Sequence, residues 1–147
     1  MFNTAFKLSV VQEQNFATGY NKSGKPMPHW EWDAIAGAGG LRSNAQDMIL
    51  CLRKLFYEDS TLKNAVNLAT TVQFDSTRFP GTKIGLGWFI TEGKNSLIVG
   101  HGGTTRSFKS MLMYDKINNR GTVVLSNTYR DINDIAEYVY DKEKLVK

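Results

Sequence analysis

The stretch Ser96-Leu-Ile-Val-Gly-His-Gly-Gly-Thr-Thr105 joins a short apolar run to a histidine flanked by glycines. The run Leu97–Val99 is typical of a buried strand. Glycines at the end of a strand usually mark a place where another group comes close to the backbone. Histidine can donate or accept a proton near neutral pH. The stretch therefore predicts a strand that forms one wall of a binding cleft, with His101 in that wall.

Further strands are predicted on both sides of this stretch. Residues 84–91 are expected to form the strand before it, joined to it by a hairpin turn at 92–95. The runs Met111–Tyr114 and Thr122–Ser126 follow it, and a polar turn joins them. Consecutive strands with short turns form an antiparallel meander, which here has about four strands.

Helices are predicted before and after this meander. Residues 44–57 carry apolar side chains at helical spacing, and Ser43 and Gln46 have the spacing of a capping box. A weaker helical segment covers about 60–72. The last segment predicts an amphipathic helix that packs on the sheet through Ile132, Ile135, Ala136 and Val139. Helices together with an antiparallel sheet indicate the α+β class, arranged as a layered α/β sandwich.

Composition limits the kinds of protein that this chain can be. The 147 residues fit a single domain, with a loop and helical part at 1–80 and the sheet with its C-terminal helix at 81–147. The net charge is only +4 and the basic residues are scattered, so we expect no nucleic-acid partner. One cysteine and two distant histidines predict no metal and no cofactor. No apolar run approaches the ~18 residues of a membrane span, and no signal-peptide pattern opens the chain, so the compartment stays open.

Five stretches, taken in order, resemble the serine β-lactamase and penicillin-binding-protein family, which includes class C β-lactamases, D-Ala-D-Ala carboxypeptidases and related esterases. They are Ala17–Tyr20, Ala38–Met48, Gly85–Trp88, Gly100–Thr105 with Phe108, and Val123–Asn127. The resemblance covers only the family's C-terminal part. It implies a partial β-lactamase-like fold, in which a sheet flanked by helices faces a helical subdomain across the active-site cleft.

The family's chemistry uses three motifs: a Ser-x-x-Lys with the nucleophile, a Tyr-x-Asn or Ser-x-Asn, and a Lys-Thr-Gly or His-x-Gly on the edge strand. His101-Gly102-Gly103 matches the third, and the second occurs nowhere in the chain. The resemblance implies that the Thr104 N–H is an oxyanion-hole donor, a contribution of ~3 kcal/mol to transition-state binding. It also implies that His101 holds a substrate carboxylate or helps to move a proton. Gly102, Gly103 and Thr105 would then bind the substrate.

The first motif has one match in spacing, Ser60-Thr-Leu-Lys63. A four-residue pattern arises easily by chance, and a serine at this position is more typical of a helix cap. Ser107 also departs from the family, which usually has glycine there. The sequence therefore predicts a C-terminal fragment of a serine hydrolase that is inactive alone. Two alternatives stay open: a non-catalytic module that binds a peptide-like ligand along the His101–Thr105 strand, and a small hydrolase that uses Ser60 and Lys63.

The partners follow from this hypothesis. The complete protein would act on an acyl compound, which is a lactam, a D-Ala-peptide or an ester. A fragment without the nucleophile helix and part of the sheet would expose a strand edge and an apolar face. We therefore expect a second copy to cover that surface, as a homodimer or by strand exchange.

Overall fold

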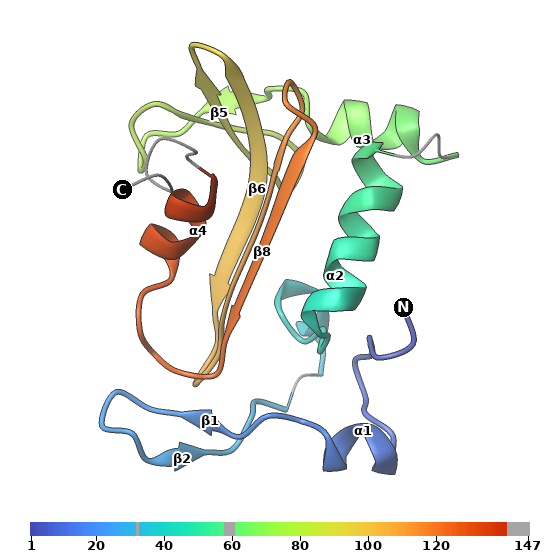
Figure 1. Ribbon diagram of the computed structural model, residues 1–147, viewed down its shortest axis with the longest axis vertical. Helices are drawn as coiled ribbons and strands as arrows, with labels where there is room; N and C mark the ends of the chain where they lie inside the picture. Colours follow the sequence, from blue (N-terminus) through green and yellow to red (C-terminus); the bar gives the residue numbers. More distant parts are fainter. Residues whose placement is uncertain (32, 58–60, 141–147) are drawn as a thin grey trace.

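The computed structural model describes residues 1–31, 33–57 and 61–140. In this part of the chain a six-stranded antiparallel sheet lies between helices on its two faces (Figure 1), which confirms the α+β class. The strands follow one another in chain order from β3 to β8, so the sheet is a meander. The helical elements are α1 Val10–Gln14, the 3₁₀ turn η1 Ala36–Ala38, α2 Ala45–Leu52, the π-helical turn η2 Arg53–Tyr57, α3 Lys63–Ala69 and α4 Asn133–Tyr140. The strands are β1 Gly19–Tyr20, β2 Pro26–Met27, β3 Phe74–Asp75, β4 Thr82–Ile84, β5 Phe89–Gly93, β6 Ser96–Thr104, β7 Lys109–Asp115 and β8 Arg120–Ser126.

The meander has six strands where the sequence predicts about four, because the chain reverses inside one predicted strand and because β3 adds a strand before it. A single strand over 84–91 is wrong: β4 ends at Ile84, β5 begins at Phe89, and the two pair antiparallel. Gly87, in the turn between them, has a φ of 76°, which is a conformation that favours glycine. The later predictions are confirmed, since β7 and β8 contain the predicted strands and β6 extends the predicted Leu97–Val99 to Thr104.

The long predicted helix over 44–57 is confirmed as α2 followed by η2, but its cap differs. Asn44 is the N-cap, and its side-chain oxygen accepts the Asp47 N–H at 2.8 Å. The predicted cap, Ser43, instead has its hydroxyl 2.8 Å from the hydroxyl of Thr4. The segment predicted over 60–72 contains α3, whereas Ser60 lies outside the described residues.

The main core lies between α2 and one face of the sheet. Leu52 of α2 packs with Ile90, Val99 and Tyr114, and none of the four is more than 4% exposed. The Phe56 ring, from η2, stacks on Tyr114 with a centroid distance of 4.5 Å. Burying each such side chain contributes about 1.5–3 kcal/mol, so this cluster fixes α2 over the middle of the sheet.

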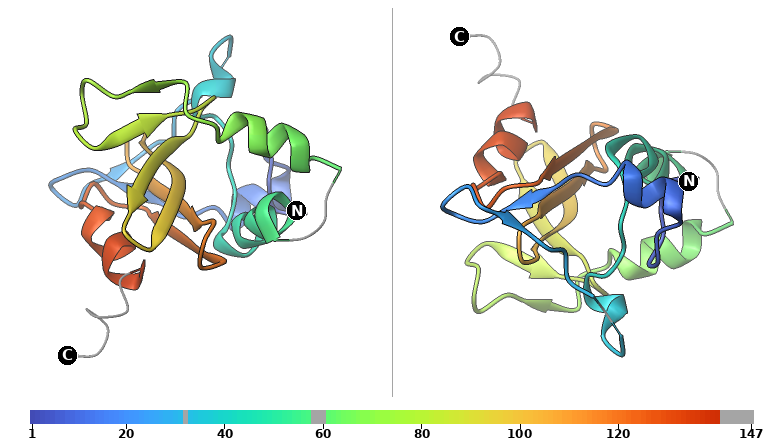
Figure 2. Two further views of the ribbon diagram at one scale, coloured as in Figure 1. Left: turned by 90° about the horizontal axis from the view of Figure 1, so that it is seen from above. Right: turned by 90° about the horizontal axis from the view of Figure 1, so that it is seen from below.

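The opposite face of the sheet is covered by α4 along β7 and β8 (Figure 2). Ile132 and Ala136 are buried there, as predicted. Ile135 is 52% exposed, which corrects its predicted place on the packed face. It lies about 100° around the helix from Ala136, so it cannot face the sheet with it. The Val139 side chain lies outside the described part of the chain.

One buried carboxylate connects the strands at the far end of the meander. Asp115, at the end of β7, is 0% exposed. Its Oδ1 accepts the backbone N–H of Leu97 in β6 at 3.2 Å, and those of Ile117 and Asn118 in the following turn at 2.9 and 3.2 Å. The same side chain therefore holds β6, β7 and the turn into β8 in one arrangement.

Residues 1–31 form more regular structure than the loop that the sequence predicts for this part of the chain. Ser9 and Gln12 make a capping box at the start of α1. The strands β1 and β2 pair as a hairpin. The Tyr20 N–H donates to the carbonyl of Asn127 at 2.8 Å, which attaches this hairpin to the chain just after β8. In the described residues, no helix is long and apolar enough to cross a membrane.

Asp47, in the first turn of α2, ties the N-terminal segment to that helix. Its Oδ2 accepts the Asn3 N–H and the Thr4 hydroxyl, both at 2.8 Å, and the residue is only 4% exposed. Burial disfavours the charged form of the carboxyl. The hydrogen bonds from Thr4 and Asn3, together with the N-terminal ammonium, outweigh this effect and lower the pKa of Asp47 below its ordinary value of 3.8.

We expect the Asp47→Asn variant to unfold at a lower urea concentration than the wild type at pH 7. A carboxyl whose folded-state pKa is lowered stabilises the fold above its unfolded pKa, and this stabilisation is lost as pH falls through the folded value. The two midpoints should therefore converge below about pH 4. Far-UV circular dichroism in urea measures both effects, and Asp33→Asn, at an exposed aspartate, is the control. Equal midpoints at pH 7 would contradict this role of Asp47.

Candidate functional site

Strand β6 has a partner along only one of its edges where the His-Gly-Gly motif lies. Its pairing with β5 ends at Gly100, opposite Phe89. Its pairing with β7 continues to Thr104, opposite Lys109. No strand in the described ranges pairs with residues 101–104 on the β5 side. These four residues therefore form a free strand edge.

The direction of the backbone groups on this free edge follows from the pairing with β7. The Thr105 N–H donates to the Phe108 carbonyl at 2.9 Å, on the β7 side. The N–H and C=O groups of successive strand residues point to opposite sides of the strand. Thr104 and Gly102 therefore direct theirs toward the free edge. An oxyanion donor at Thr104, as the family resemblance implies, needs this direction.

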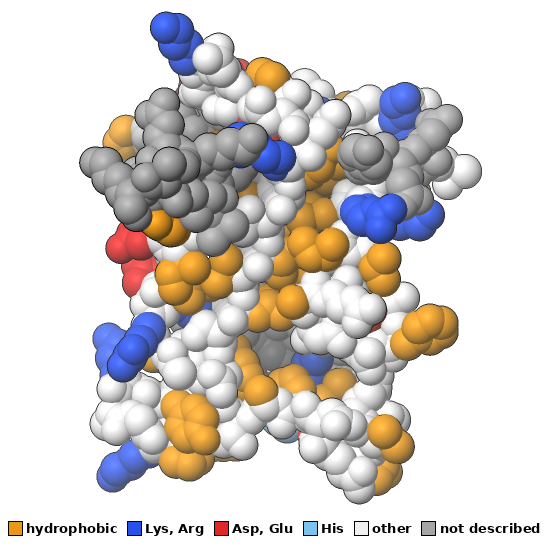
Figure 3. Space-filling model, in the orientation of Figure 1, with side chains coloured by type: hydrophobic (Ala, Val, Ile, Leu, Met, Phe, Trp, Pro, Cys, Tyr) orange, Lys and Arg blue, Asp and Glu red, His pale blue; other side chains and the backbone are white. Residues whose placement is uncertain are grey.

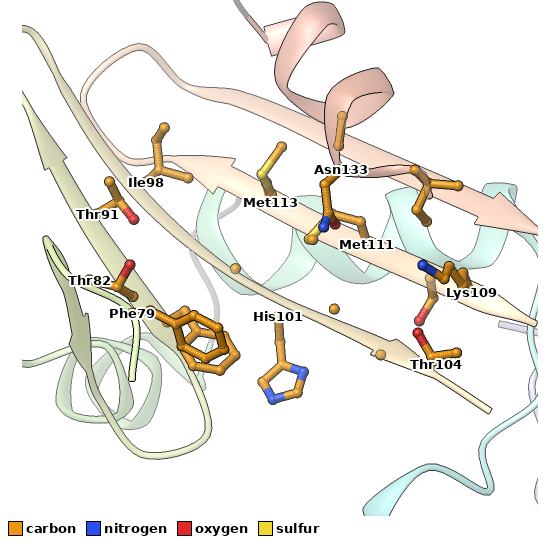
Figure 4. A pocket seen from close by; sticks show the side chains of 17 residues that line it. Phe79, Thr82, Thr91, Ile98, His101, Thr104, Lys109, Met111, Met113 and Asn133 are labelled. Atoms are coloured by element: carbon orange, nitrogen blue, oxygen red, sulfur yellow. The ribbon is translucent and has the colours of Figure 1, made fainter. Parts of the chain in front are cut away.

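The His101 side chain lies on the sheet face that carries α2. It is two residues from Val99, which packs against α2, and alternate residues of a strand share a face. In Figure 4 its ring points to the opposite side of β6 from the side chains of Met111 and Met113. The residue is exposed. The imidazole is thus accessible beside the free edge rather than enclosed in the core.

The glycines of the motif differ in what surrounds them. A Cβ on Gly100 would lie 2.6 Å from the carbonyl oxygen of Leu112, so β6 can approach β7 only with glycine there. A Cβ on Gly102 would lie 2.8 Å from the end of the Met111 side chain. A Cβ on Gly103 would meet nothing within 4 Å. Of the two glycines predicted to bind substrate, Gly103 leaves open space on the His101 face and Gly102 leaves room for Met111.

A groove of about 470 Å³ follows β6 on the other face of the sheet, beside α4 (Figure 4). Ile98, Met111 and Met113 make its floor apolar, and Thr82 and Thr91 add hydroxyl groups. The groove also reaches residues 102–104 of the free edge. At that end, Lys109 Nζ lies 3.6 Å from Asp131 Oδ1, just before α4 begins.

The loop after β6 is packed against the N-terminal segment. Thr105 is half-buried at its start, with its N–H already bonded to Phe108. Ser107 is 0% exposed, and its hydroxyl has no hydrogen-bond partner in the described structure. A Cβ on Gly19 would lie 2.7 Å from the Ser107 Cβ, so a serine fits here because residue 19 is glycine. The Phe108 ring contacts that of Phe16 at 5.3 Å.

The structure brings the predicted residues 101–105 together at one strand end, and no serine hydroxyl of the described residues is hydrogen-bonded to His101 there. Lys63 is exposed at the start of α3, and Ser60 lies outside the described residues. His29 is 2.9 Å from Glu31 Oε1 and meets the Phe16 ring edge-on. Among the described residues no three His, Cys, Asp or Glu side chains form a possible metal site.

Two residues next to His101 escape prediction from the sequence. The His101 ring stacks on that of Phe89, with centroids 5.1 Å apart and planes 26° apart. The Phe79 ring meets Phe89 edge-on at 5.8 Å. The signal that could have located them is Gly85-Leu-Gly87, because a chain reversal there puts Phe89 at the start of a strand, beside Gly100.

Two solved structures resemble this fold over nearly its whole length. One, described as a class C beta-lactamase, gives a TM-score of 0.81 at 16% identity, and the match covers 98% of this chain and 47% of that one. The other is a beta-lactamase/D-alanine carboxypeptidase from Pseudomonas syringae, with a TM-score of 0.79, 17% identity, and coverage of 98% and 49%. This chain thus spans about half the length of either structure.

Comparison of the sequences gives a second, independent result. A search of curated protein sequences gives no match. The model of the family described as Beta-lactamase matches residues 1–141. This match includes all five stretches on which the resemblance in the sequence rests. The 147-residue chain belongs to the beta-lactamase family, and it has the serine-hydrolase-like fold of that family.

Proposed function

We propose that this chain supplies the His-Gly-Gly wall of an acyl-transfer site, and that the nucleophilic serine and its base come from outside the 147 residues. The observation that carries the proposal is the free edge of β6 at residues 101–104. An extended peptide-like compound can add to such an edge through backbone hydrogen bonds. The substrate class is an acyl compound, namely a lactam, a D-Ala-peptide or an ester.

The proposed chemistry uses the Thr104 N–H at the moment when charge develops. A serine oxygen attacks the substrate carbonyl carbon, its proton passes to a base, and the carbonyl oxygen becomes an oxyanion. A donor already fixed on the strand stabilises that oxyanion more than it stabilises the uncharged carbonyl. The oxyanion then collapses and the C–N or C–O bond breaks as the base returns its proton to the leaving nitrogen or oxygen. An amine or alcohol departs, or in a lactam the amine stays attached to the opened ring, and water hydrolyses the acyl ester. Without the serine, this chain binds the substrate but does not acylate.

His101 and Gly103 complete the binding wall in this proposal. The imidazole is exposed on the face where Gly103 leaves open space. A ligand carboxylate placed there could accept a hydrogen bond from the ring, and the ring could also pass a proton to a leaving group. The backbone groups of Gly102 and Thr104 would bind the extended part of the same ligand.

A non-catalytic binding module is the second candidate. It is favoured by one observation, which is that no hydroxyl among the described residues is hydrogen-bonded to His101. A free strand edge is sufficient for binding a peptide-like ligand, and acylation is not required for that role. The two candidates share the same binding wall and differ only in whether a serine reaches it.

We also propose that a second copy of the chain covers the apolar surface around β8 and α2. Strand β8 is an edge of the sheet in the described residues. Leu125 on β8 is 42% exposed, and Ile49 and Leu50 on α2 are 38% and 39% exposed. Figure 3 shows hydrophobic side chains gathered down the middle of the face that carries β8 and α2. An edge strand beside exposed apolar side chains favours association.

The 147-residue chain alone should form no covalent adduct with a fluorescent penicillin or a fluorophosphonate. Both reagents react with a serine that a base activates, and in our proposal this serine lies outside the 147 residues. Intact-protein mass spectrometry after incubation measures the result, with a complete class C enzyme as the positive control. An adduct located at Ser60 would contradict the proposal and establish the small hydrolase that uses Ser60 and Lys63.

The Thr104→Pro variant should weaken binding of N-acetyl-D-alanyl-D-alanine by about fivefold to tenfold, because it removes one hydrogen-bond donor. The fold should persist, since the Thr104 N–H faces the free edge and proline there costs no bond of the sheet. Titration monitored by NMR gives the dissociation constants.

Two further variants control for the chemistry of this change. Thr104→Val keeps the N–H, so it should bind the ligand as the wild type does. Thr105→Pro removes the bond to the Phe108 carbonyl and should lower the urea midpoint instead. Unchanged affinity in Thr104→Pro, or equal loss in Thr104→Val, would show that the Thr104 amide is not the donor.

Light scattering after gel filtration should give a mass near twice the chain mass of 16.5 kDa. The Leu125→Glu variant places a charge on the proposed contact surface and should shift the protein toward the monomer. Ile35→Glu, at a residue that is 66% exposed outside this surface, is the control and should leave the mass unchanged. A wild-type protein that stays monomeric at high concentration would refute the second copy.

A further inference from the structure

We infer that the β1–β2 hairpin positions the Thr104 amide, and that it acts through the turn that follows β6. The inference rests on the proposed function, because it concerns the donor that the proposed site uses. It adds Gly19 of β1 and Ser107 of the turn as positioning residues. Neither of these residues touches the ligand, and both act by deciding where the end of β6 lies.

The turn after β6 comprises residues 105–108 and leads directly from the donor. Thr104 is the last residue of β6, and Lys109, the first residue of β7, is its pairing partner. The bond from the Thr105 N–H to the Phe108 carbonyl, at 2.9 Å, closes the turn. The Thr104 N–H faces the free edge, where no strand among the described residues holds it. The position of this donor therefore follows the position of the turn.

The N-terminal segment packs closely against two residues of this turn. Ser107 is 0% exposed, and Gly19 is buried beside it. A Cβ on Gly19 would lie 2.2 Å from the Ser107 Oγ, 2.7 Å from the Ser107 Cβ and 2.8 Å from the Phe108 ring. The Phe16 ring, shortly before β1, has its centroid 5.3 Å from that of Phe108. The turn therefore has no room to approach the hairpin further.

The hairpin itself has a fixed place at the end of the sheet (Figure 1 and Figure 2). The Tyr20 N–H donates to the Asn127 carbonyl, and the Asn127 side-chain amide donates to the Thr18 carbonyl, both at 2.8 Å. Asn127 follows Ser126, the residue of β8 that pairs with Lys109. The hairpin is thus attached to the sheet beyond β7 and meets the turn from there.

The Ser107 hydroxyl indicates that packing holds the turn against the hairpin. This hydroxyl is buried and has no hydrogen-bond partner in the described structure. Burying a hydroxyl without a partner is unfavourable, so the contacts of the turn with Gly19 and Phe16 must offset that cost. A turn that is held by such contacts moves when the shape of the opposing surface changes. The size of residue 19 therefore decides where the turn and the Thr104 amide lie.

Moving a side chain from one side of this contact to the other tests the inference. In Gly19→Ala the new methyl group must displace the turn, and we expect N-acetyl-D-alanyl-D-alanine to bind about fivefold more weakly. In the double variant Gly19→Ala with Ser107→Gly, the methyl group takes the space that the serine side chain leaves. Binding should then return to within about twofold of the wild type. Gly37→Ala, where a Cβ meets nothing within 4 Å, is the control and should bind normally. Titrations monitored by NMR give these constants.

A second readout follows the position of the donor without any ligand. The Thr104 and Thr105 amide signals should move in the NMR spectrum of Gly19→Ala and return in the double variant, because amide shifts report local geometry. A loss of stability alone would lower the urea midpoint and leave the signals of the folded state in place. If Gly19→Ala does not fold, Phe16→Leu replaces it, since it removes the ring contact with Phe108 without adding a clash. The Thr104 signal should move in that variant too, and an unmoved signal would overturn the inference.

The outcomes separate this inference from the proposed function. Unmoved Thr104 signals or unchanged affinity in a folded Gly19→Ala variant, or a double variant that binds no better, overturn the positioning role and leave the Thr104 donor standing. Moved signals and weaker binding in Gly19→Ala, in a protein whose Thr104→Pro variant binds normally, support the action of the hairpin on the turn and overturn the Thr104 amide as the donor. A wild type that binds no ligand overturns the proposed function, and the amide signals alone then decide the positioning.

Discussion

The candidate site depends on one constraint, which is that β5 stops pairing with β6 at Gly100 while β6 continues to Thr104. Unpaired backbone N–H and C=O groups at a strand edge must find partners in water or in a ligand. The reversal at Gly87 decides where β5 begins, so a turn outside the motif decides that the motif has a free edge. The aromatic contacts around His101 follow from the same reversal, because it delivers Phe89 to that position.

The edge of β6 that faces β7 is paired along its length, in contrast to the free edge at residues 101–104. Asp115 binds the N–H groups of Leu97 and of the turn after β7, so the register of β6 on β7 is set at one end. At Gly100 the absence of a side chain allows β6 to lie close to the Leu112 carbonyl. A slip of one residue would exchange the two faces of the strand. It would bury His101 under α4 and turn the Thr104 N–H toward β7.

The sequence predicts the features that depend on local patterns and misses those that depend on contacts between distant segments. The class, the meander and α2 follow from periodicity, which each segment carries by itself. The sequence does not reveal the reversal within 84–91, because its apolar residues continue through Gly85 and Gly87. The burial of Asp47 depends on Asn3 and Thr4 folding back over α2. In the site, the motif identified the strand, but only the packing distinguishes open Gly103 from Gly102.

The same reasoning accounts for the serine at position 107, where the resemblance in the sequence leads us to expect glycine. Among the described residues other than glycine only Asn119 has a positive φ, so the backbone at Ser107 does not require glycine. What it requires is space, and Gly19 of β1 provides that space by having no side chain. The hairpin that contains Gly19 is in turn held by Asn127, just after β8. The shape of the loop after β6 thus depends on the loop itself, on the β1–β2 hairpin and on the residues just after β8. A residue larger than glycine at position 19 would displace this loop even though the His-Gly-Gly motif is unchanged.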